Sequence, residues 1–469
     1  MTTVPALGPD HHRSPTPTAA AVRPILVLLL ASGATFLGML DATVVNVAFP
    51  DLRDSFPRIA ISQLSWVITA YAVVFAALLA AAGRLADVLG RQRLFLMSVL
   101  GFALTSMAAG AAPGAGWLIA ARAVQGATAA GMIPAALGLL LVNTPPAKRA
   151  AALGIWGAAG AMAAAVGPSL GGLLVEGLSW RSIFLINVPF GLVICYGVLR
   201  RLPADAPSGR QLPDPVGIVS LVLAIGSPVM GLSQGSDWGW TSPEVLGLFA
   251  AGLTFGVVVW LRSRSHPAPA IERDLWHSRV FTAANVTSAL FGAAMYAWLL
   301  AGPLYLASIW HYSVLRSGLG VTPGAFLAAL GAVLVGRRVP LKRQWTAVLF
   351  GTALFGATCT WMALALHASP SYTAVWLPTG LLGGLAIGCV LTGLTSIGST
   401  AVPPLRFAAG SGVLMTSRQV GGALGVAGMA VILASDGLAS PDGFLTVFVL
   451  CATVAVLAAG SSFALRHRS

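Results

Sequence analysis

One short stretch of the sequence combines three side chains that can carry a proton or hydrogen-bond a ligand. Residues 40–50 bring the carboxylate of Asp41, the hydroxyl of Thr43 and the carboxamide of Asn46 to the far end of an apolar run that begins near Ile25. An ionised side chain at membrane depth costs at least ~2.5 kcal/mol, so such residues usually face a protein interior or a water-filled path and act there. The stretch therefore indicates proton or ion chemistry. The alternative is a carboxylate near a helix end that reaches the interface.

A second polar group lies in another apolar run. Arg122 and Gln125 are three residues apart and share one face of a helix, and Gly126 and Ala130 continue a strip of small residues there. A guanidinium keeps its charge and needs a carboxylate, carbonyl groups or water. Asp41 is the partner we expect, because we place every other acidic residue in a water-exposed loop. An Arg hydrogen-bonded to backbone, with purely structural value, is the alternative.

A later apolar run repeats this chemistry. Arg418 and Gln419 are followed by Gly421, Gly422 and Gly425, which suits a bundle built from related halves. If Arg418 lies near a helix end, it only extends its charge to the interface. The residues that we expect to line a substrate cavity are Thr43, Asn46, Gln125, Arg418 and Gln419.

These residue types argue against most other chemistry. A membrane-embedded enzyme would need a nucleophile, a metal cluster or paired acids at membrane depth, and the apolar runs offer one Asp and two Arg. We therefore expect no enzyme, no metal site and no cofactor. The cysteines are widely spaced within apolar runs, as small buried side chains are, and they are Cys195, Cys359, Cys389 and Cys451.

The composition is that of a polytopic membrane protein. Of the 469 residues, 57% are hydrophobic and 9% are charged, against roughly 45–50% and 25% in soluble domains. Residues 1–23 are rich in proline and predict a disordered cytoplasmic tail. The apolar run after Arg23 is longer than that of a cleavable signal.

Runs of about 20 apolar residues predict an all-α protein with fourteen transmembrane helices. The predicted spans are residues 25–48, 62–83, 94–112, 117–142, 151–174, 181–199, 215–234, 245–261, 280–302, 318–336, 345–366, 373–396, 409–434 and 444–465.

The basic residues support this number of spans. Cytoplasmic loops collect Lys and Arg, and with a cytoplasmic N-terminus most of the 27 basic residues fall in inside segments. The exceptions are Arg53, Arg58, Arg181 and Arg316 in outside loops, and Arg122 and Arg418 within spans. One span more or fewer after the middle would invert every later loop. The net charge of +13 therefore reflects topology and contact with anionic lipids, not nucleic-acid binding, and both termini are expected in the cytoplasm.

The loop between the second and third spans has an ordered pattern. Residues 83–93 place Asp87 among three arginines, where ion pairs can form in one arrangement of the helices and break in another. Gly83 and Gly90 allow a tight turn. By charge alone this would be an ordinary cytoplasmic loop.

Here the sequence resembles the major facilitator superfamily. Its signature loop is matched by Gly83, Leu85, Asp87, Gly90 and Arg91. Residues 118–126 are similar to the superfamily's intramembrane Arg motif. The glycine-proline motif of antiporters is resembled by Gly154, Gly167, Pro168, Gly171 and Gly172. The stretches around Asp41, at 180–189 and at 404–425 resemble the fourteen-span drug:proton antiporter branch.

The resemblance implies a fold, a division into domains and roles for residues. It implies the major facilitator fold, with six-helix bundles at 24–200 and 263–469 and two extra central helices within 201–262. It implies proton coupling by Asp41 and Arg122, and a conformational switch formed by Gly83, Asp87, Gly90, Arg91, Gly167, Pro168, Gly171 and Gly172. In that family the bend at the glycine-proline motif blocks leakage.

Two departures from the family pattern bear on the switch. Ala163 stands where glycine is expected, which still permits close packing. The corresponding loop of the second half, 336–343, contains no acid, so it cannot form an equivalent acid-based latch. The switch would then depend on the first half.

The expected function is a proton-coupled exporter of lipophilic small molecules by alternating access, driven by the proton gradient. It would act in the cytoplasmic membrane as a monomer. The last six spans hold no acid, so we expect neutral, anionic or monocationic substrates. A dedicated exporter of one endogenous metabolite or self-made antibiotic remains open, and so does a receptor or scaffold that transports nothing.

Overall fold

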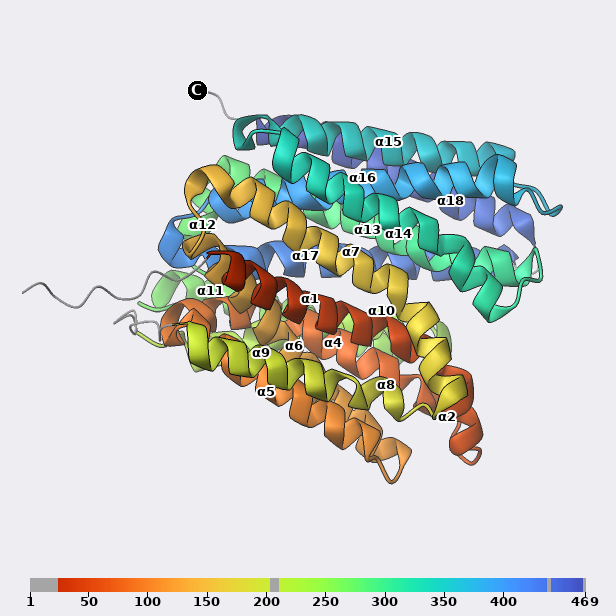
Figure 1. The fold of residues 1–469 in the computed structure, drawn as a ribbon, viewed down its shortest axis with the longest axis horizontal. Coiled ribbons are helices and arrows are strands. Elements are labelled where there is room, and N and C mark those ends of the chain that lie inside the picture. Colours follow the sequence, from red (N-terminus) through yellow and green to blue (C-terminus); the bar gives the residue numbers. More distant parts are fainter. Residues whose placement is uncertain (1–23, 203–210, 437–439, 467–469) are drawn as a thin grey trace, which may run out of the picture.

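Long helices account for almost all of the structure, a computed structural model that describes residues 24–202, 211–436 and 440–466 (Figure 1). Within these ranges, thirteen helical segments are long and apolar enough to cross a membrane. A further helix of 30 residues, α17 (Phe407–Asp436), carries Arg418 and Gln419 near its middle. The all-α fold with fourteen long helices is confirmed. The predicted tail at 1–23 lies outside the described residues.

The helices of the first part follow the predicted apolar runs. Their bounds are α1 (Pro24–Val47), α4 (Trp66–Leu89), α5 (Arg91–Gly110), α6 (Ala115–Val142), α7 (Pro146–Gly177), α8 (Ser182–Leu185) and α9 (Asn187–Arg201). Two short helices, α2 (Phe49–Ser55) and α3 (Ile61–Leu64), lie in the connection after α1 and were not predicted.

The sixth predicted span is divided. Its residues form α8 and α9, with a turn at Ile186. Pro189 has no amide hydrogen to donate to the carbonyl of Leu185, so the hydrogen-bonding pattern is interrupted here. The interruption makes Asn187 the first residue of α9.

Two helices, α10 (Pro215–Trp238) and α11 (Pro243–Ser265), follow α9 and precede the helices of the C-terminal part. The helices of the C-terminal part are α12 (Asp274–His277), α13 (Arg279–Ser308), α14 (Val314–Arg338), α15 (Gln344–Ala365), α16 (Leu377–Thr400), α17 and α18 (Pro441–Ser462). Short helical turns η1 (Leu341–Arg343), η2 (Tyr372–Trp376), η3 (Pro404–Arg406) and η4 (Phe463–Leu465) flank them.

The larger hydrophobic clusters follow two groups of helices. Those of the N-terminal half are built mainly from α1, α4–α7, α8 and α9, and the first also includes residues near the start of α17. That of the C-terminal half is built mainly from α13, α15, α16, α17 and α18. The two groups lie beside each other with their helices running in the same general direction (Figure 1). We propose the domain boundaries 24–200, 201–262 and 263–469 from this division.

Glycines bring the two halves into backbone contact. A Cβ atom at Gly83 of α4 would lie 2.3 Å from the carbonyl oxygen of Ala408 in α17. One at Gly154 of α7 would lie 2.5 Å from the carbonyl oxygen of Ala332 in α14. Small residues allow this approach, which is how helices associate in membranes.

The expectation that every acid except Asp41 lies in water was wrong. Asp87, Asp214 and Glu272 are also buried. Each lies against an arginine, respectively Arg91, Arg262 and Arg84. The hydrogen bonds from Arg262 hold the pKa of the Asp214 carboxyl below its usual range. Asp214 also caps α10, since it accepts from the amide of Val216 at 3.1 Å, and so it joins α10 to α11.

The contact at Gly154 yields a stability prediction. Gly154→Ala should lower stability by about 1–3 kcal/mol through overpacking against α14. Gly172→Ala is the matched control on the same helix, because a Cβ atom there meets nothing within 4 Å. The temperature at which half of the purified protein leaves the monodisperse elution peak measures both. Equal half-denaturation temperatures for Gly154→Ala and Gly172→Ala would contradict the close contact between α7 and α14.

Candidate functional site

A buried ion pair joins α1 to α6. Nη1 of Arg122 lies 2.5 Å from Oδ2 of Asp41, and both residues are only 1% exposed. Residues far apart in the sequence meet here because α1 and α6 pack together in the N-terminal half. The structure therefore brings together the two predicted proton-coupling residues.

Two amides complete the environment of the carboxylate. Oδ1 of Asp41 accepts from Nε2 of Gln125 at 2.9 Å and from Nδ2 of Asn187 at 2.8 Å. Both amides also donate to the hydroxyl of Ser106 in α5, at 2.7 and 3.2 Å. Groups from α5, α6 and α9 thus surround the buried carboxylate of α1.

The guanidinium has partners besides Asp41. Its Nε donates to the carbonyl of Val67 at 3.0 Å and its Nη1 to Oε1 of Gln125 at 2.7 Å. Its Cζ lies 4.2 Å from the centre of the Tyr71 ring, a cation–π contact. Because of these contacts, Arg122 keeps partial compensation for its charge even when the Asp41 carboxylate is neutral.

One acceptor beside the pair is unused. Oδ1 of Asn187 is buried and accepts no hydrogen bond from any described residue. A protonated carboxyl is a donor, whereas an ionised one only accepts. Rotation of the Asn187 side-chain amide by a half-turn would exchange Nδ2 and Oδ1, so that Oδ1 could accept a hydrogen bond from a protonated Asp41. The site can therefore hydrogen-bond both forms of the acid.

Sequence reasoning missed several of these groups. The sequence analysis assigned no role to Ser106, Val67 or Asn187. Tyr71 resembles the aromatic residues that are common near the ends of membrane spans. Asn187 carried a signal, because a carboxamide within an apolar run needs a polar partner. Val67 contributes only a backbone carbonyl, which no residue type reveals.

The predicted switch loop forms a latch between the halves, which we define as Asp87, Arg91, Pro404, Ala408 and Ala409. Asp87 accepts from Nε of Arg91 at 2.7 Å and from the amides of Ala409 at 2.7 Å and Ala408 at 3.4 Å. Arg91 in turn donates to the carbonyl of Pro404 at 2.6 Å. A carboxylate at the N-terminus of α17 is stabilised by the free amides and the helix dipole.

Two glycines of the switch have distinct roles in the latch. Gly83 provides the close approach to Ala408 described above. Gly90 has a φ of 104°, a conformation that side chains disfavour, and it separates α4 from α5. This turn sets Arg91 within reach of Asp87.

The glycine-proline stretch of α7 packs against α1. A Cβ atom at Gly167 would lie 2.1 Å from Oγ1 of Thr43, and one at Gly171 would lie 3.0 Å from a methyl carbon of Val44. Pro168 lies within α7 and close to Gly318 of α14. Gly172 has no such neighbour. The role of this stretch as a switch stays a prediction.

The predicted cavity residues lie in different surroundings. Thr43 donates to backbone carbonyls of its own helix, and Asn46 is exposed at the end of α1. Gln125 is fully buried on Asp41. Arg418 and Gln419 lie on α17, where Oε1 of Gln419 accepts from the hydroxyl of Tyr296 at 2.5 Å. Substrate contact by these residues stays a prediction.

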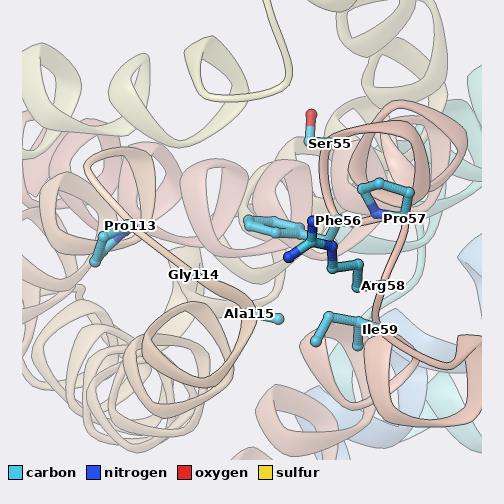
Figure 2. A pocket seen from close by; sticks show the side chains of 8 residues that line it. All are labelled: Ser55, Phe56, Pro57, Arg58, Ile59, Pro113, Gly114 and Ala115. Carbon is cyan, nitrogen blue, oxygen red and sulfur yellow. The ribbon is translucent and has the colours of Figure 1, made fainter.

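The surface pocket shown in Figure 2 contains none of the predicted site residues. It has a volume of about 280 Å³ and lies between the connection after α2 and the start of α6. Its lining residues are Ser55, Phe56, Pro57, Arg58, Ile59, Pro113, Gly114 and Ala115.

Comparison with known families decides the class of protein. Residues 31–426 match the Major Facilitator Superfamily. The chain belongs to this superfamily. Superfamily members are transporters without cofactors, so the expectations of no enzyme and no cofactor are confirmed, and the chain is a multi-pass membrane protein.

Two relatives place this superfamily member near drug exporters. It is 34% identical to the puromycin resistance protein pur8 of Streptomyces alboniger over 441 residues, 90% of this chain and 85% of the relative. It is 32% identical to the multidrug resistance protein Stp of Mycobacterium tuberculosis over 413 residues, 87% and 76% of the two chains. The predicted fourteen-span exporter branch is confirmed.

A solved structure supports the fold of this superfamily member. The human organic anion transporter MFSD10 (TETRAN) superposes with a TM-score of 0.70 at 15% identity, covering 94% of this chain and 99% of that one. This similarity concerns the fold alone.

The ion pair predicts a stability pattern. Arg122→Gln leaves the buried Asp41 carboxylate without its cation, which should cost about 3–5 kcal/mol. Adding Asp41→Asn should recover most of this loss, since the remaining groups are neutral. Half-denaturation temperatures in detergent measure the effect, with the exposed Arg58→Gln as the control. A double variant no more stable than Arg122→Gln would argue against the pair.

The latch predicts a conformational shift. Asp87→Asn removes a charged acceptor, and since hydrogen bonds to charged groups contribute about 1.5–3 kcal/mol, the separated arrangement of the halves should gain roughly 10- to 100-fold in population. Distances between spin labels at the exposed Leu89 and Leu405 report this arrangement in a cysteine-free background. The isosteric Asp51→Asn, at an exposed acid outside the latch, should leave the distance distribution unchanged. An unaltered distribution in Asp87→Asn would show that the latch does not hold the halves.

Proposed function

We propose that this superfamily member is a drug:proton antiporter, a secondary active exporter of lipophilic small molecules. The observation that carries the proposal is the Asp41–Arg122 pair, 2.5 Å apart and sealed from solvent. A buried ion pair gains little stability over apolar residues, so its presence within the membrane argues for a function. Proton carriage is the function that suits a single acid at that depth.

The proposed step is a change in what Asp41 can bind. As a carboxylate it holds Arg122, Gln125 and Asn187 together. When it takes up a proton, its attraction to Arg122 falls, and Arg122 retains its contacts with Val67, Gln125 and Tyr71. The hold of α1 on α6 is then weakened, which favours a second arrangement of the bundle. Release of the proton restores the pair.

The energy available from one proton is modest but sufficient. One charge crossing 100 mV yields ~2.3 kcal/mol. Since ~1.4 kcal/mol is a factor of ten, one proton supports roughly a fiftyfold gradient of a neutral substrate. A gradient of this size is enough to protect a cell from a toxic compound.

The proposed location is the cytoplasmic membrane, with both termini in the cytoplasm. The distribution of basic residues along the sequence supports this orientation. The latch would then close the cytoplasmic end of the pathway. We propose that the chain acts as a monomer among membrane lipids, with protons and one small molecule as its ligands.

A dedicated exporter of one self-made antibiotic or metabolite is the second candidate. The name of the relative pur8 records resistance to a single antibiotic, puromycin, whereas that of Stp records multidrug resistance. A panel of structurally unrelated substrates separates the two, because a dedicated exporter would respond to one compound class.

Proton release from reconstituted protein tests the proposal. Vesicles containing the wild type should release protons on addition of substrate from a panel of dyes and antibiotics, and Asp41→Asn should abolish this response, because the amide cannot carry a proton. Asp442→Asn, at an exposed acid, should behave as the wild type. Uphill transport at full rate by Asp41→Asn would exclude this mechanism. A receptor or scaffold would give no substrate-dependent proton release in any variant.

A further inference from the structure

The guanidinium of Arg418 has no partner in the described part of the chain. Its Nε is buried without a hydrogen-bond acceptor, and no ion pair or cation–π contact involves it. The side chain is partly buried on α17, about 16 Å along the helix from Phe407 at ~1.5 Å per residue. This depth is close to the middle of a hydrocarbon core about 30 Å thick. Extension of the side chain to the membrane–water interface therefore does not explain the buried, unpaired Nε of Arg418.

Arg418 points away from lipid. Among the described side chains of α17, Leu424 and Val431 are exposed, at 56% and 49%, and they lie about 120–140° around the helix from Arg418. Gly421 and Gly425 lie near the Arg418 side, and their Cβ positions would fall 1.9 and 2.0 Å from carbonyl oxygens of α13. Arg418 therefore faces α13 and the interior of the bundle.

The side chains of Tyr296 and Gln419 leave an amide donor free beside Arg418. The ring of Tyr296 lies against Gly422, one turn from Arg418, and its hydroxyl donates to Oε1 of Gln419. This bond uses the amide oxygen of Gln419 and leaves its NH₂ group, which has no partner among the described residues. Arg418 and Gln419 thus offer N–H donors in excess.

The C-terminal half holds no acid near the depth of Arg418. Residues 280–465 contain only Asp436 and Asp442, which lie at the end of α17 and the start of α18. Asp41 is held by Arg122, Gln125 and Asn187 in the other half. An anionic ligand would supply the counter-charge that these helices lack.

We propose that Arg418, with the free NH₂ group of Gln419, binds the acidic group of an anionic substrate, a lipophilic carboxylate or sulfonate. Arginine pairs with such groups through two parallel hydrogen bonds. The inference rests on the proposed export function and narrows its substrates from neutral, anionic or monocationic compounds to anions. The occupant is a solute, because Arg418 lies too deep for a lipid headgroup.

Equilibrium binding to a matched pair of probes tests the proposal. Dansyl-phenylalanine carries a carboxylate, and its carboxamide is neutral and otherwise the same. In phosphatidylcholine nanodiscs at pH 7.5 the wild type should bind the carboxylate about 10- to 100-fold more tightly, the usual effect of hydrogen bonds to a charged group. Arg418→Gln should remove this preference and leave the Kd of the carboxamide within about twofold. Arg316→Gln, at an exposed arginine, should keep the preference.

A second variant places an anion of the protein itself beside Arg418. It provides an independent test in case Arg418→Gln does not fold. Gln419→Glu is isosteric and places a carboxylate beside Arg418, so it should also abolish the preference. Equal binding of both probes by the wild type would overturn the proposal. So would a preference that survives in folded Arg418→Gln or, where that variant does not fold, in Gln419→Glu.

Two further measurements distinguish the solute site from a lipid site and from the antiport mechanism. If replacing half of the phosphatidylcholine by phosphatidylglycerol removes the preference, an anionic headgroup occupies the site and the proposed solute site is wrong. The titration needs no proton gradient, so it does not depend on the antiport mechanism. A wild type that prefers the carboxylate but releases no protons would contradict the antiport mechanism and leave this site standing.

Discussion

The cost of a charge in a medium without water governs the N-terminal half. The buried carboxylate of Asp41 is compensated by a cation and two amide donors. Meeting that requirement fixes several other features. α6 must place Arg122 and Gln125 on one face, α9 must begin at Asn187, and α5 must present Ser106 to both amides. The break between α8 and α9 belongs to the same arrangement, because it sets the position of Asn187.

The two halves have similar helical architecture but differ in whether their buried arginine has an acidic partner. The N-terminal half pairs its buried cation with a buried acid, whereas the C-terminal half holds a cation without one. The interface between them also depends on acids outside the C-terminal helices. Asp87 lies on the N-terminus of α17, and Glu272, which precedes α12, contacts both Arg84 and Arg406. In the proposed mechanism, proton exchange and recognition of substrate charge therefore lie in different halves.

Much of this arrangement was accessible from the sequence. The spans follow from runs of apolar residues, and the Asp41–Arg122 contact follows from the scarcity of charge within those runs. The helix shared by Arg122 and Gln125 follows from their spacing. Other features depend on tertiary structure. No residue pattern reveals the carbonyl of Val67 or the amides of Ala408 and Ala409, because backbone groups are common to all residues. The burial of Asp214 and Glu272 was missed because arginines distant in sequence cover them.

α17 carries two of the features described above on one unbroken helix. Its first turn is held by Asp87, and Arg418 lies about 16 Å further along. The helix is continuous between the two points, and Gly410 and Gly412 are its glycines in this stretch. If the proposed ligand tilted the whole helix at Arg418, the backbone amides of Ala408 and Ala409 would move with it. In that case, ligand binding at Arg418 would be coupled mechanically to the contact between Asp87 and the start of α17.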